Sequence, residues 1–415
     1  MGRSHLQARR GFLTTLGAAA VAGGSHAADS SSNAAAPGDT HADAQSLLEP
    51  GLIYLNTATL GPTSRAVMER TLQIWRALES SPVRQVYGDG AAHLETDRVP
   101  GQAAALLNCD ADDLLITRNT TEAMNSVAQG ILLGPGDRVL TTDQEHDGGS
   151  VCWRYQARRR GVVVDKIAIN PAEYSSAAIL QRFATAIQRN TRVVSVSHVI
   201  TSTGLRMPIA EIAALARQRG ILCVVDGAQA VGAIAVDLRQ LNCHAYATSG
   251  HKWLLGPKGT GLLYLHPDAK DAIQPIQRED GHAFVSHSSG SGSMPLLAGL
   301  GTAIETLRQH GMAQVEDRAV ALRNRAYAGL RQLPTSKLRV VGPPPGPLAT
   351  PIVAAELDAG VDSRHLRDVL QNKHRIIVKM VEKQWFNGIR IAPNYLNTED
   401  DVDALLRALR VELAA

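Results

Sequence analysis

The sequence has few of the residues that mark several classes of protein. Its 415 residues include four cysteines, which form no C-x-x-C pair, and aromatic residues make up 4% of the chain. Cys223 lies within an apolar run that predicts core packing. One or two disulfides are possible in the periplasm, and the sequence leaves open whether any forms. The 14 histidines form no H-E-x-x-H motif or similar cluster, so we expect no metal site.

A surplus of charge of one sign is lacking as well. Three of the 42 lysines and arginines lie in the first 28 residues, which hold no acid, so the rest carries 39 basic and 39 acidic side chains. This balance argues against nucleic acid or an anionic membrane as the main partner. With 44% hydrophobic and 20% charged residues, the composition is typical of a globular protein with one large and one smaller domain.

The amino terminus has the pattern of an export signal. Arg9 and Arg10 precede a weakly apolar run over residues 14–24, and residues 25–27 have the small-x-small pattern of a signal peptidase site. The run is too short and too rich in Gly and Ala to serve as a membrane anchor. A twin arginine before such a run resembles a Tat signal, so we expect a periplasmic protein. The alternative is an unstructured tail with a chance Arg-Arg pair.

Between about residues 112 and 265, short apolar runs alternate with stretches of helical periodicity. The runs lack in–out alternation, as expected for a sheet covered on both faces. The expected strands are 113–117, 138–142, 161–169, 192–199, 221–225 and 260–264. The expected helices are 122–131, 178–188, 209–219 and 295–310. Repeated strand–helix units predict an α/β domain with a mainly parallel sheet.

The remaining C-terminal residues, with a Gly-Pro-rich loop at 342–347, predict a smaller α+β domain. We therefore divide the chain into four segments. They are a Tat signal peptide (1–28), a linker (29–46), a large domain with its N-terminal segment (47–310) and a small domain (311–415).

Polar residues follow the expected strands, at the edge where an open parallel sheet binds ligands. Thr120 and Thr121 open a helix, where hydroxyls and free N–H groups suit a phosphate. His146 and Asp226 each follow a strand. A buried carboxylate is costly alone, so Asp226 should have a cationic or proton-donating partner. A capped helix without a ligand and a structural histidine are the plainer interpretations of the first two features.

A lysine motif completes this series. Ser249-Gly-His-Lys252 precedes a Gly-rich turn, and Asp226-Gly-Ala-Gln229 lies before it. A phosphate-binding helix start, a histidine, a strand-end aspartate and this lysine are the parts that a pyridoxal phosphate site needs. In this order and spacing, the chain from about Ile53 to its end resembles the class V aminotransferases, which are fold-type I pyridoxal phosphate enzymes.

The resemblance implies both a fold and a cofactor. The fold would be the α/β fold of fold-type I transferases, with a mainly parallel seven-stranded sheet in the large domain and a smaller C-terminal α+β domain. The cofactor would be pyridoxal 5'-phosphate.

The resemblance also gives each residue a role. Lys252 matches the Schiff-base lysine that moves the proton at the substrate Cα. Asp226 matches the partner of the pyridine nitrogen, and His146 the histidine that stacks on the ring. Gln229 and Thr201 match positions beside the ring hydroxyl, although many relatives carry Asn in place of Thr201. The positions that bind the phosphate are matched by Thr120, Thr121, Ser249 and His251.

Three further positions concern a neighbouring subunit and the substrate. Ser293 stands where relatives have a threonine that reaches the phosphate of the neighbouring subunit, which implies a homodimer with composite active sites. Arg390 matches the arginine that binds the substrate carboxylate with two hydrogen bonds. A surface arginine is the alternative interpretation. Asn56 is assigned to substrate binding. Asn56-Thr-Ala, a Ser-His-Val-x-x-x-x-Gly segment and the Tat-like signal are together similar to the isopenicillin N epimerase-like branch of the family.

That branch includes exported enzymes that tailor siderophores. We therefore expect an enzyme that acts at the amino-bearing carbon of an amino acid, free or carried by a peptide or siderophore, and leave transamination, epimerisation and decarboxylation open. Cysteine desulfurases share these motifs but need a nucleophilic cysteine before the carboxylate-binding arginine. The last cysteine here is Cys243, and residues 374–390 contain none. A persulfide route is not expected, although cysteine sulfinate or selenocysteine lyase chemistry stays open.

Two other classes of function compete with this interpretation. A non-catalytic binding protein could keep the pocket, but binding alone needs no Schiff-base lysine. A nucleotide-dependent enzyme is not expected, because no strand leads into G-x-G-x-x-G and residues 256–261 lack the Lys-Ser/Thr of a P-loop.

Overall fold

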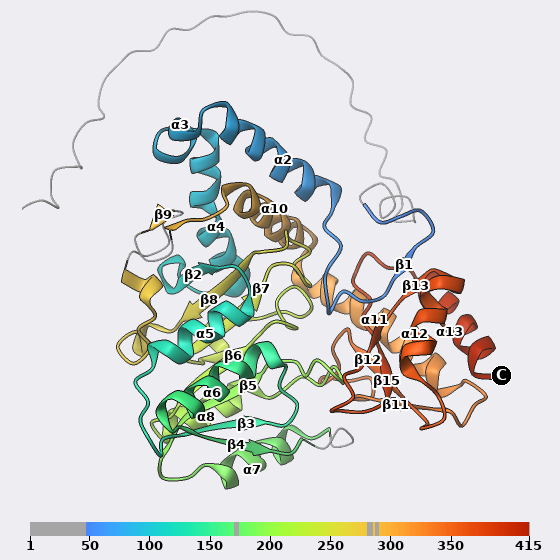
Figure 1. Ribbon diagram of the computed structural model, residues 1–415. Coiled ribbons are helices and arrows are strands. Elements are labelled where there is room, and N and C mark those ends of the chain that lie inside the picture. Colours follow the sequence, from blue (N-terminus) through green and yellow to red (C-terminus); the bar gives the residue numbers. More distant parts are fainter. Residues whose placement is uncertain (1–46, 170–173, 280–284, 287–289, 415) are drawn as a thin grey trace, which may run out of the picture. The chain divides into compact units, whose positions relative to one another are not determined.

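The computed structural model describes residues 47–169, 174–279, 285–286 and 290–414 (Figure 1). The predicted signal peptide and linker lie outside this part of the chain. The helices are α2 (Arg65–Ser80), α3 (Pro82–Tyr87), α4 (Ala91–Leu107), α5 (Thr120–Gly130), α6 (Asp147–Arg160), α7 (Ser176–Ala186), α8 (Ile209–Gln218), α9 (Leu238–Leu241), α10 (Met294–His310), α11 (Met312–Arg331), α12 (Ser363–His374) and α13 (Glu399–Ala414). None of the helices described is long and apolar enough to cross a membrane.

The strands divide between one large sheet and several small ones. They are β1 (Ile53–Tyr54), β2 (Leu114–Thr117), β3 (Arg138–Thr142), β4 (Val163–Ile167), β5 (Thr191–Ser197), β6 (Leu222–Asp226), β7 (Ala245–Ser249), β8 (Gly261–Leu265), β9 (Val285–Ser286), β10 (Gly290–Ser291), β11 (Leu338–Val341), β12 (Val353–Leu357), β13 (Ile376–Ile377), β14 (Lys379–Met380) and β15 (Gly388–Ile391). The large sheet has seven strands in the order β2-β8-β7-β6-β5-β3-β4. β8 is antiparallel to both of its neighbours, and the other neighbouring strands pair in parallel. The predicted α/β fold with a mainly parallel sheet is confirmed.

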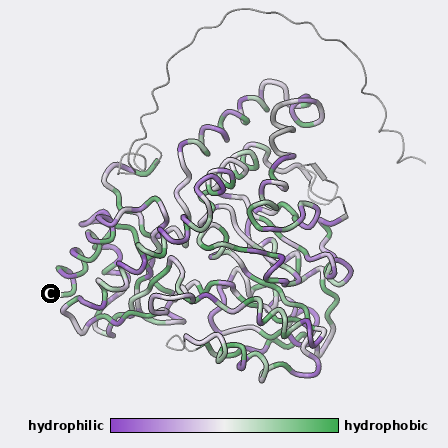
Figure 2. Tube along the Cα trace, turned by 180° about the vertical axis from the view of Figure 1, so that it is seen from behind, coloured by the Kyte–Doolittle hydropathy of each residue, from purple (hydrophilic) through white to green (hydrophobic). Residues whose placement is uncertain are grey.

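Helices cover both faces of this sheet, which explains why its strands are apolar on both sides. In β6, Cys223 and Val225 belong to a core that also holds residues of α4, α7, α8 and α10. Val224, between them, belongs to a second core with residues of α5 and α6. Because successive strand residues point to opposite faces, such a strand shows no in–out alternation. The partly exposed helix α2, at the top of Figure 2, alternates between hydrophilic and hydrophobic residues instead.

The expected strands and helices agree with the observed ones to within two residues at each end. The sequence did not predict β7, α6 or the N-terminal helices α2 to α4. β7 contains Ala245 and Ala247, and alanine has a low β-propensity. α6 has two glycines in its first turn and three arginines in its last, so its apolar periodicity is weak although Trp153 is buried. Both elements matter for the site, because β7 ends at Ser249, the first residue of the lysine motif, and His146 caps α6.

The C-terminal elements build a second, smaller core. Strands β11, β12, β15 and β14 form an antiparallel sheet whose core includes residues of α11, α12 and α13, orange to red in Figure 1. β1 pairs in parallel with β13, and Leu55 lies in this core. The segment around β1, which we assigned to the large domain, is thus tied to C-terminal strands. The predicted boundary between residues 310 and 311 falls between α10 and α11 and stays a prediction.

Candidate active site

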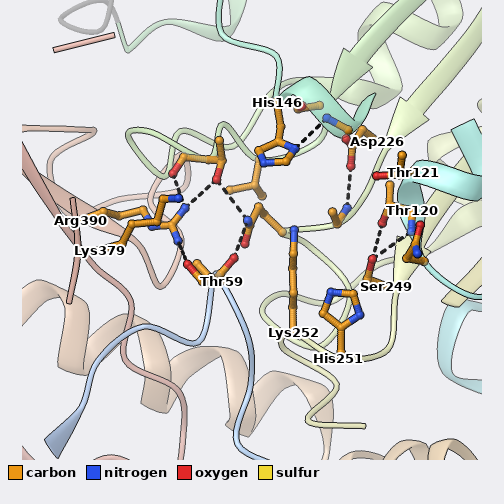
Figure 3. Close-up of a pocket in the computed structure, with 18 of the residues that line it drawn as sticks. Thr59, Thr120, Thr121, His146, Asp226, Ser249, His251, Lys252, Lys379 and Arg390 are labelled. Carbon is orange, nitrogen blue, oxygen red and sulfur yellow. Dashed lines mark hydrogen bonds between the residues drawn. The ribbon is translucent and has the colours of Figure 1, made fainter. Parts of the chain in front are cut away.

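A cavity of about 510 Å³ lies where the carboxyl ends of the parallel strands meet (Figure 3). Ten of the twelve predicted site residues line it, namely Thr120, Thr121, His146, Thr201, Asp226, Gln229, Ser249, His251, Lys252 and Arg390. Asn56 and Ser293 do not line this cavity. Ser293 precedes the first turn of α10, and its proposed contact with a neighbouring subunit stays a prediction.

The start of α5 forms one end of the cavity. Asn119 caps the helix by accepting a hydrogen bond from the Glu122 N–H at 2.9 Å, so the chain turns into a helix at Thr120. Oγ of Ser249 accepts the Thr120 N–H at 3.0 Å and lies 2.7 Å from the Thr120 hydroxyl. A helix N-terminus with hydroxyls beside it is a suitable site for a phosphate.

His251 contributes a polar atom without a partner, beside Ser249 in Figure 3. Its Nδ1 is buried and has no hydrogen-bond partner among the described residues. Burial, together with the charges of Lys252 and Lys258, lowers the pKa of His251 to about 4, so the ring is neutral at physiological pH. A neutral imidazole can donate one hydrogen bond. The ring therefore fits a phosphate ligand as a neutral donor.

Asp226 ends β6 with a buried carboxylate. Its Oδ1 accepts the Ala228 N–H at 2.9 Å. The first turn of α6 packs against Oδ2, since a Cβ built on Gly149 would lie 2.4 Å from that atom. His146 caps the same helix, because its Nδ1 accepts the Gly148 N–H at 3.0 Å. The carboxylate and the imidazole are thus positioned by one helix start.

The same capping bond decides the state of the His146 ring. Burial and the nearby charge of Lys252 lower the pKa of His146, which favours the neutral ring. With Nδ1 occupied as an acceptor, the neutral ring carries its proton on Nε2.

The Lys252 side chain points from the turn after β7 into the cavity (Figure 3). Its Nζ makes no hydrogen bond with the described residues. Burial lowers its pKa to about 8; Asp226 opposes this shift, and Arg390 adds to it. The turn is held by Gly61, whose N–H donates to the His251 carbonyl at 2.7 Å. A side chain at Gly61 would collide with the Lys252 carbonyl, at 1.9 Å from an added Cβ.

Arg390 on β15 is 4% exposed, which excludes the interpretation as a surface arginine. Its Nη1 donates to the carbonyl and the hydroxyl of Thr201, at 3.1 and 2.7 Å. Its Nη2 donates to Thr59 Oγ1 at 2.8 Å and to Asn56 Oδ1 at 3.4 Å. Asn56 therefore contacts the arginine rather than the cavity. Burial lowers the pKa of Arg390 to about 10, so the group keeps its charge at physiological pH.

Gln229 and Thr201 lie on the same wall of the cavity. Nε2 of Gln229 donates to Thr201 Oγ1 at 3.1 Å and to the Ala58 carbonyl at 2.9 Å, while its Oε1 accepts the Trp253 Nε1–H at 2.8 Å. All polar atoms of this amide are thus used within the fold, which fixes its orientation.

Several lining residues were missed at the level of sequence. Lys379, Glu382 and Trp385 reach the cavity from the segment around β14, and Thr59 reaches it from the N-terminal segment. The one available signal was a lysine interrupting the apolar run from Ile376 to Val381.

Glu145 was also missed, although it lies next to His146. It accepts hydrogen bonds from Thr142 at 2.7 Å and from Ser197 at 2.6 Å. Burial raises the pKa of Glu145 to about 7. It thus links the ends of β3 and β5 behind the cavity wall.

Known proteins resemble this chain over most of its length. The family described as aminotransferase class V matches residues 53–405. The chain is 32% identical over 388 residues to the isopenicillin N epimerase of Streptomyces clavuligerus. The aligned residues make up 88% of this chain and 95% of that protein. It is 30% identical over 311 residues to a cysteine desulfurase of Serratia proteamaculans, covering 70% and 75% of the two chains.

Solved structures confirm the predicted fold type. A cysteine desulfurase from Thermococcus onnurineus superposes with a TM-score of 0.79 at 21% identity, covering 92% of this chain and all of that one. C-DES, with glycine covalently linked to its pyridoxal phosphate cofactor, superposes with a TM-score of 0.78 at 23% identity, over 87% of this chain and 97% of that one.

The cavity fits the predicted cofactor. It offers an anion site at the start of α5, an orphaned imidazole nitrogen, a buried carboxylate and a lysine amine without a hydrogen-bond partner among the described residues. The cofactor is pyridoxal 5'-phosphate, and the chain belongs to the class V aminotransferase family.

Proposed function

We propose that this enzyme moves a proton at the amino-bearing carbon of an amino acid, with epimerisation as the outcome. One observation carries the proposal: the amine of Lys252, the carboxylate of Asp226 and the guanidinium of Arg390 line one cavity. These groups supply a proton carrier, a partner for the pyridine nitrogen and a carboxylate site. Similarity to two isopenicillin N epimerases over 88% of the chain supports epimerisation.

Each protein group has one task in this reaction. Pyridoxal phosphate, when bound, withdraws electrons from the substrate Cα and so acidifies its proton. Thr120, Ser249 and His251 hold the phosphate. Asp226 keeps the ring nitrogen protonated, because an adjacent carboxylate stabilises the positive charge. Lys252 carries the proton to and from Cα, and Arg390 holds the α-carboxylate.

The lowered pKa of Lys252 suits this task. An ordinary lysine, with a pKa of 10.5, is almost wholly protonated at neutral pH and cannot accept a proton. Burial lowers the pKa of Lys252 to about 8, so a useful fraction of the amine is neutral near physiological pH.

Sulfur transfer is a weaker candidate, although cysteine desulfurases are among the relatives. The route through a protein persulfide needs a cysteine thiolate near the substrate. None of the cavity-lining residues is a cysteine. Cys223 and Cys243 are buried in the core, where burial raises the pKa of each thiol.

The experiment that tests the proposal is proton exchange in D₂O with single L- and D-amino acids. Proton NMR would follow loss of the Cα–H signal, and chiral chromatography would follow the opposite enantiomer. We expect exchange with inversion in the parent protein and neither in Lys252→Ala. Exchange that yields a 2-oxo acid would establish transamination instead. No exchange with any free or peptide-borne amino acid, while sulfide is released from cysteine, would refute the proposal.

We further propose that the enzyme is exported through the Tat route and acts in the periplasm on an amino acid, free or carried by a peptide or siderophore. The support is the twin arginine, Arg9 and Arg10, before a weakly apolar run. A protein that crosses the membrane folded can take its cofactor with it.

We also propose that the enzyme forms a homodimer with composite active sites. Its support is Ser293, which stands at the start of α10, outside the cavity of its own chain, with no capping hydrogen bond from its side chain.

A further inference from the structure

We propose that Lys379 binds a second acidic group of the substrate, so that the enzyme selects amino acids carrying a carboxylate on the side chain as well as on Cα. The inference deepens the proposed function and rests on its placement of the α-carboxylate at Arg390. It is carried by the juxtaposition of Lys379 and Arg390 on one wall of the cavity.

The two cations are neighbours across an antiparallel pair of strands. β14 pairs with β15 so that Lys379 lies directly opposite Arg390. Residues directly opposite in such a pair point to the same face, with Cβ atoms about 4.5–5.5 Å apart. Both side chains line the cavity, and Figure 3 shows them side by side. Two like charges in this arrangement repel each other, so their placement is a cost to the fold.

Lys379 makes fewer hydrogen bonds within the fold than Arg390 does. The four hydrogens on the Nη atoms of Arg390 can be assigned to neutral oxygens of Thr201, Thr59 and Asn56, which a substrate carboxylate would replace in part. The buried Nε of Arg390 has no hydrogen-bond partner among the described residues. Lys379 Nζ donates to Glu382 Oε1 at 2.8 Å, its one hydrogen bond with the described residues. An ammonium has three donors, so two remain for a ligand. The Lys379 side chain is 30% exposed, which leaves it accessible from the cavity.

The charge of Lys379 acts inside the cavity. It contributes to the lowered pKa of both Lys252 and His146, which line the same cavity. Along this wall Glu382 is the acidic residue that lines the cavity, and its side chain is 49% exposed. Lys379 and Arg390 therefore outnumber the acid beside them. With one substrate carboxylate at Arg390, this wall is neutral as long as Glu382 stays on Lys379. The half-exposed Glu382 can turn to solvent, and a second substrate carboxylate would then take its place on Lys379.

The competing explanation is that Lys379 and Glu382 form a structural ion pair three residues apart. Binding of carboxylic acids that lack an amino group distinguishes the two, because such probes bind without turnover. We propose calorimetric titration of the holoenzyme with glutarate and with pentanoate, which share five carbons and differ in one carboxylate.

The parent should bind glutarate more tightly than pentanoate by roughly ten-fold or more, the effect of one charge-assisted hydrogen bond. Lys379→Met should remove this preference and leave the pentanoate affinity within about two-fold. Lys383→Met is the matched control, since it removes the same charge from an exposed neighbour that does not line the cavity, and it should keep the preference. Glu382→Gln should keep or increase it, because it frees a donor on Lys379. The absorbance of the bound cofactor checks that each variant is loaded.

Two results would overturn the inference: a parent without preference for glutarate, or a preference that survives in Lys379→Met. The Cα–H exchange assay keeps this outcome separate from that of the proposed function. Exchange with glutamine but not with glutamate or aspartate would refute the role of Lys379 and leave the proposed function standing. Loss of the glutarate preference in Lys379→Met, without exchange on any amino acid, would support the subsite and refute the reaction.

Discussion

Gly149 is where a single added methyl group should disturb the chemistry more than the fold. In Gly149→Ala, the new Cβ would lie 2.4 Å from Oδ2 of Asp226, about 1 Å closer than ordinary contact between heavy atoms. Asp226 has little freedom to withdraw, because Oδ1 is held by the Ala228 N–H and its strand is paired on both sides. We therefore expect the carboxylate to turn or shift by up to about 1 Å.

The effects on stability and on activity should differ in size. Overpacking costs about 1–3 kcal/mol, while replacing glycine by alanine in a helix returns about 1 kcal/mol, so the free energy of unfolding should fall by roughly 0–2 kcal/mol. A displacement of about 1 Å at a catalytic group can cost on the order of 100-fold in rate. We expect kcat to fall by roughly this factor, with a well-folded protein and retained cofactor.

Gly101→Ala is the matched control. Gly101 also lies in a helix, but no heavy atom lies within 4 Å of an added Cβ. This variant should gain up to about 1 kcal/mol in stability and keep full activity. Thermal unfolding, the absorbance of the bound cofactor and kcat would be measured for both proteins. Parent-like kcat in Gly149→Ala would refute the claim that the α6 start fixes the Asp226 carboxylate.

Four further predictions test the other assignments. Borohydride reduction should fix the cofactor on Lys252; an adduct on Lys258, whose Nζ donates to Gly61 O and Thr63 Oγ1 at 2.9 Å, would contradict this. Asp226→Asn should keep the cofactor but lose roughly 100-fold or more in kcat, because an amide does not hold the ring nitrogen protonated; parent-like turnover would make Asp226 structural. Uptake of pyridoxal phosphate by the cofactor-free protein should rise with pH to a half-maximum near 8, since the neutral amine reacts and burial lowers the pKa of Lys252; a midpoint near 10.5 would argue against that shift. Replacing Arg9 and Arg10 with lysines should leave folded, loaded enzyme in the cytoplasm, and fractionation that finds it in the periplasm would exclude the Tat route.

The sequence predicted the part of the site that lies at strand ends. Asp226 follows an apolar run, and Thr120 and Thr121 follow another, so the parallel topology alone brings them to one edge of the sheet. The lysine motif was recognised from its spacing to the Asp226 motif. The strand that leads into it, β7, was not predicted, because its two alanines have a low β-propensity.

The wall opposite the sheet could not be predicted in the same way. Lys379 faces the cavity because of its register with Arg390, and the register of two short strands is not visible in their sequence. Thr59 reaches the arginine because β1 pairs with β13, a contact between residues more than 300 positions apart. The predicted role of Asn56 in substrate binding stays a prediction, since its Oδ1 accepts a hydrogen bond from Arg390 and its side chain does not line the cavity.

Arg390 gives the strongest physical argument that this cavity takes an anion. Its guanidinium meets only neutral oxygens, and no carboxylate of the described residues lies within salt-bridge distance of it. A buried charge without a directly paired opposite charge is costly. Burial lowers the pKa of Arg390 to about 10, and the charge of Glu382 opposes this shift only in part, so the group keeps its charge. Under the proposed function the substrate carboxylate supplies the missing negative charge. A family motif can point to the arginine, but this imbalance of charge becomes visible only when Thr201, Thr59 and Asn56 are found around it.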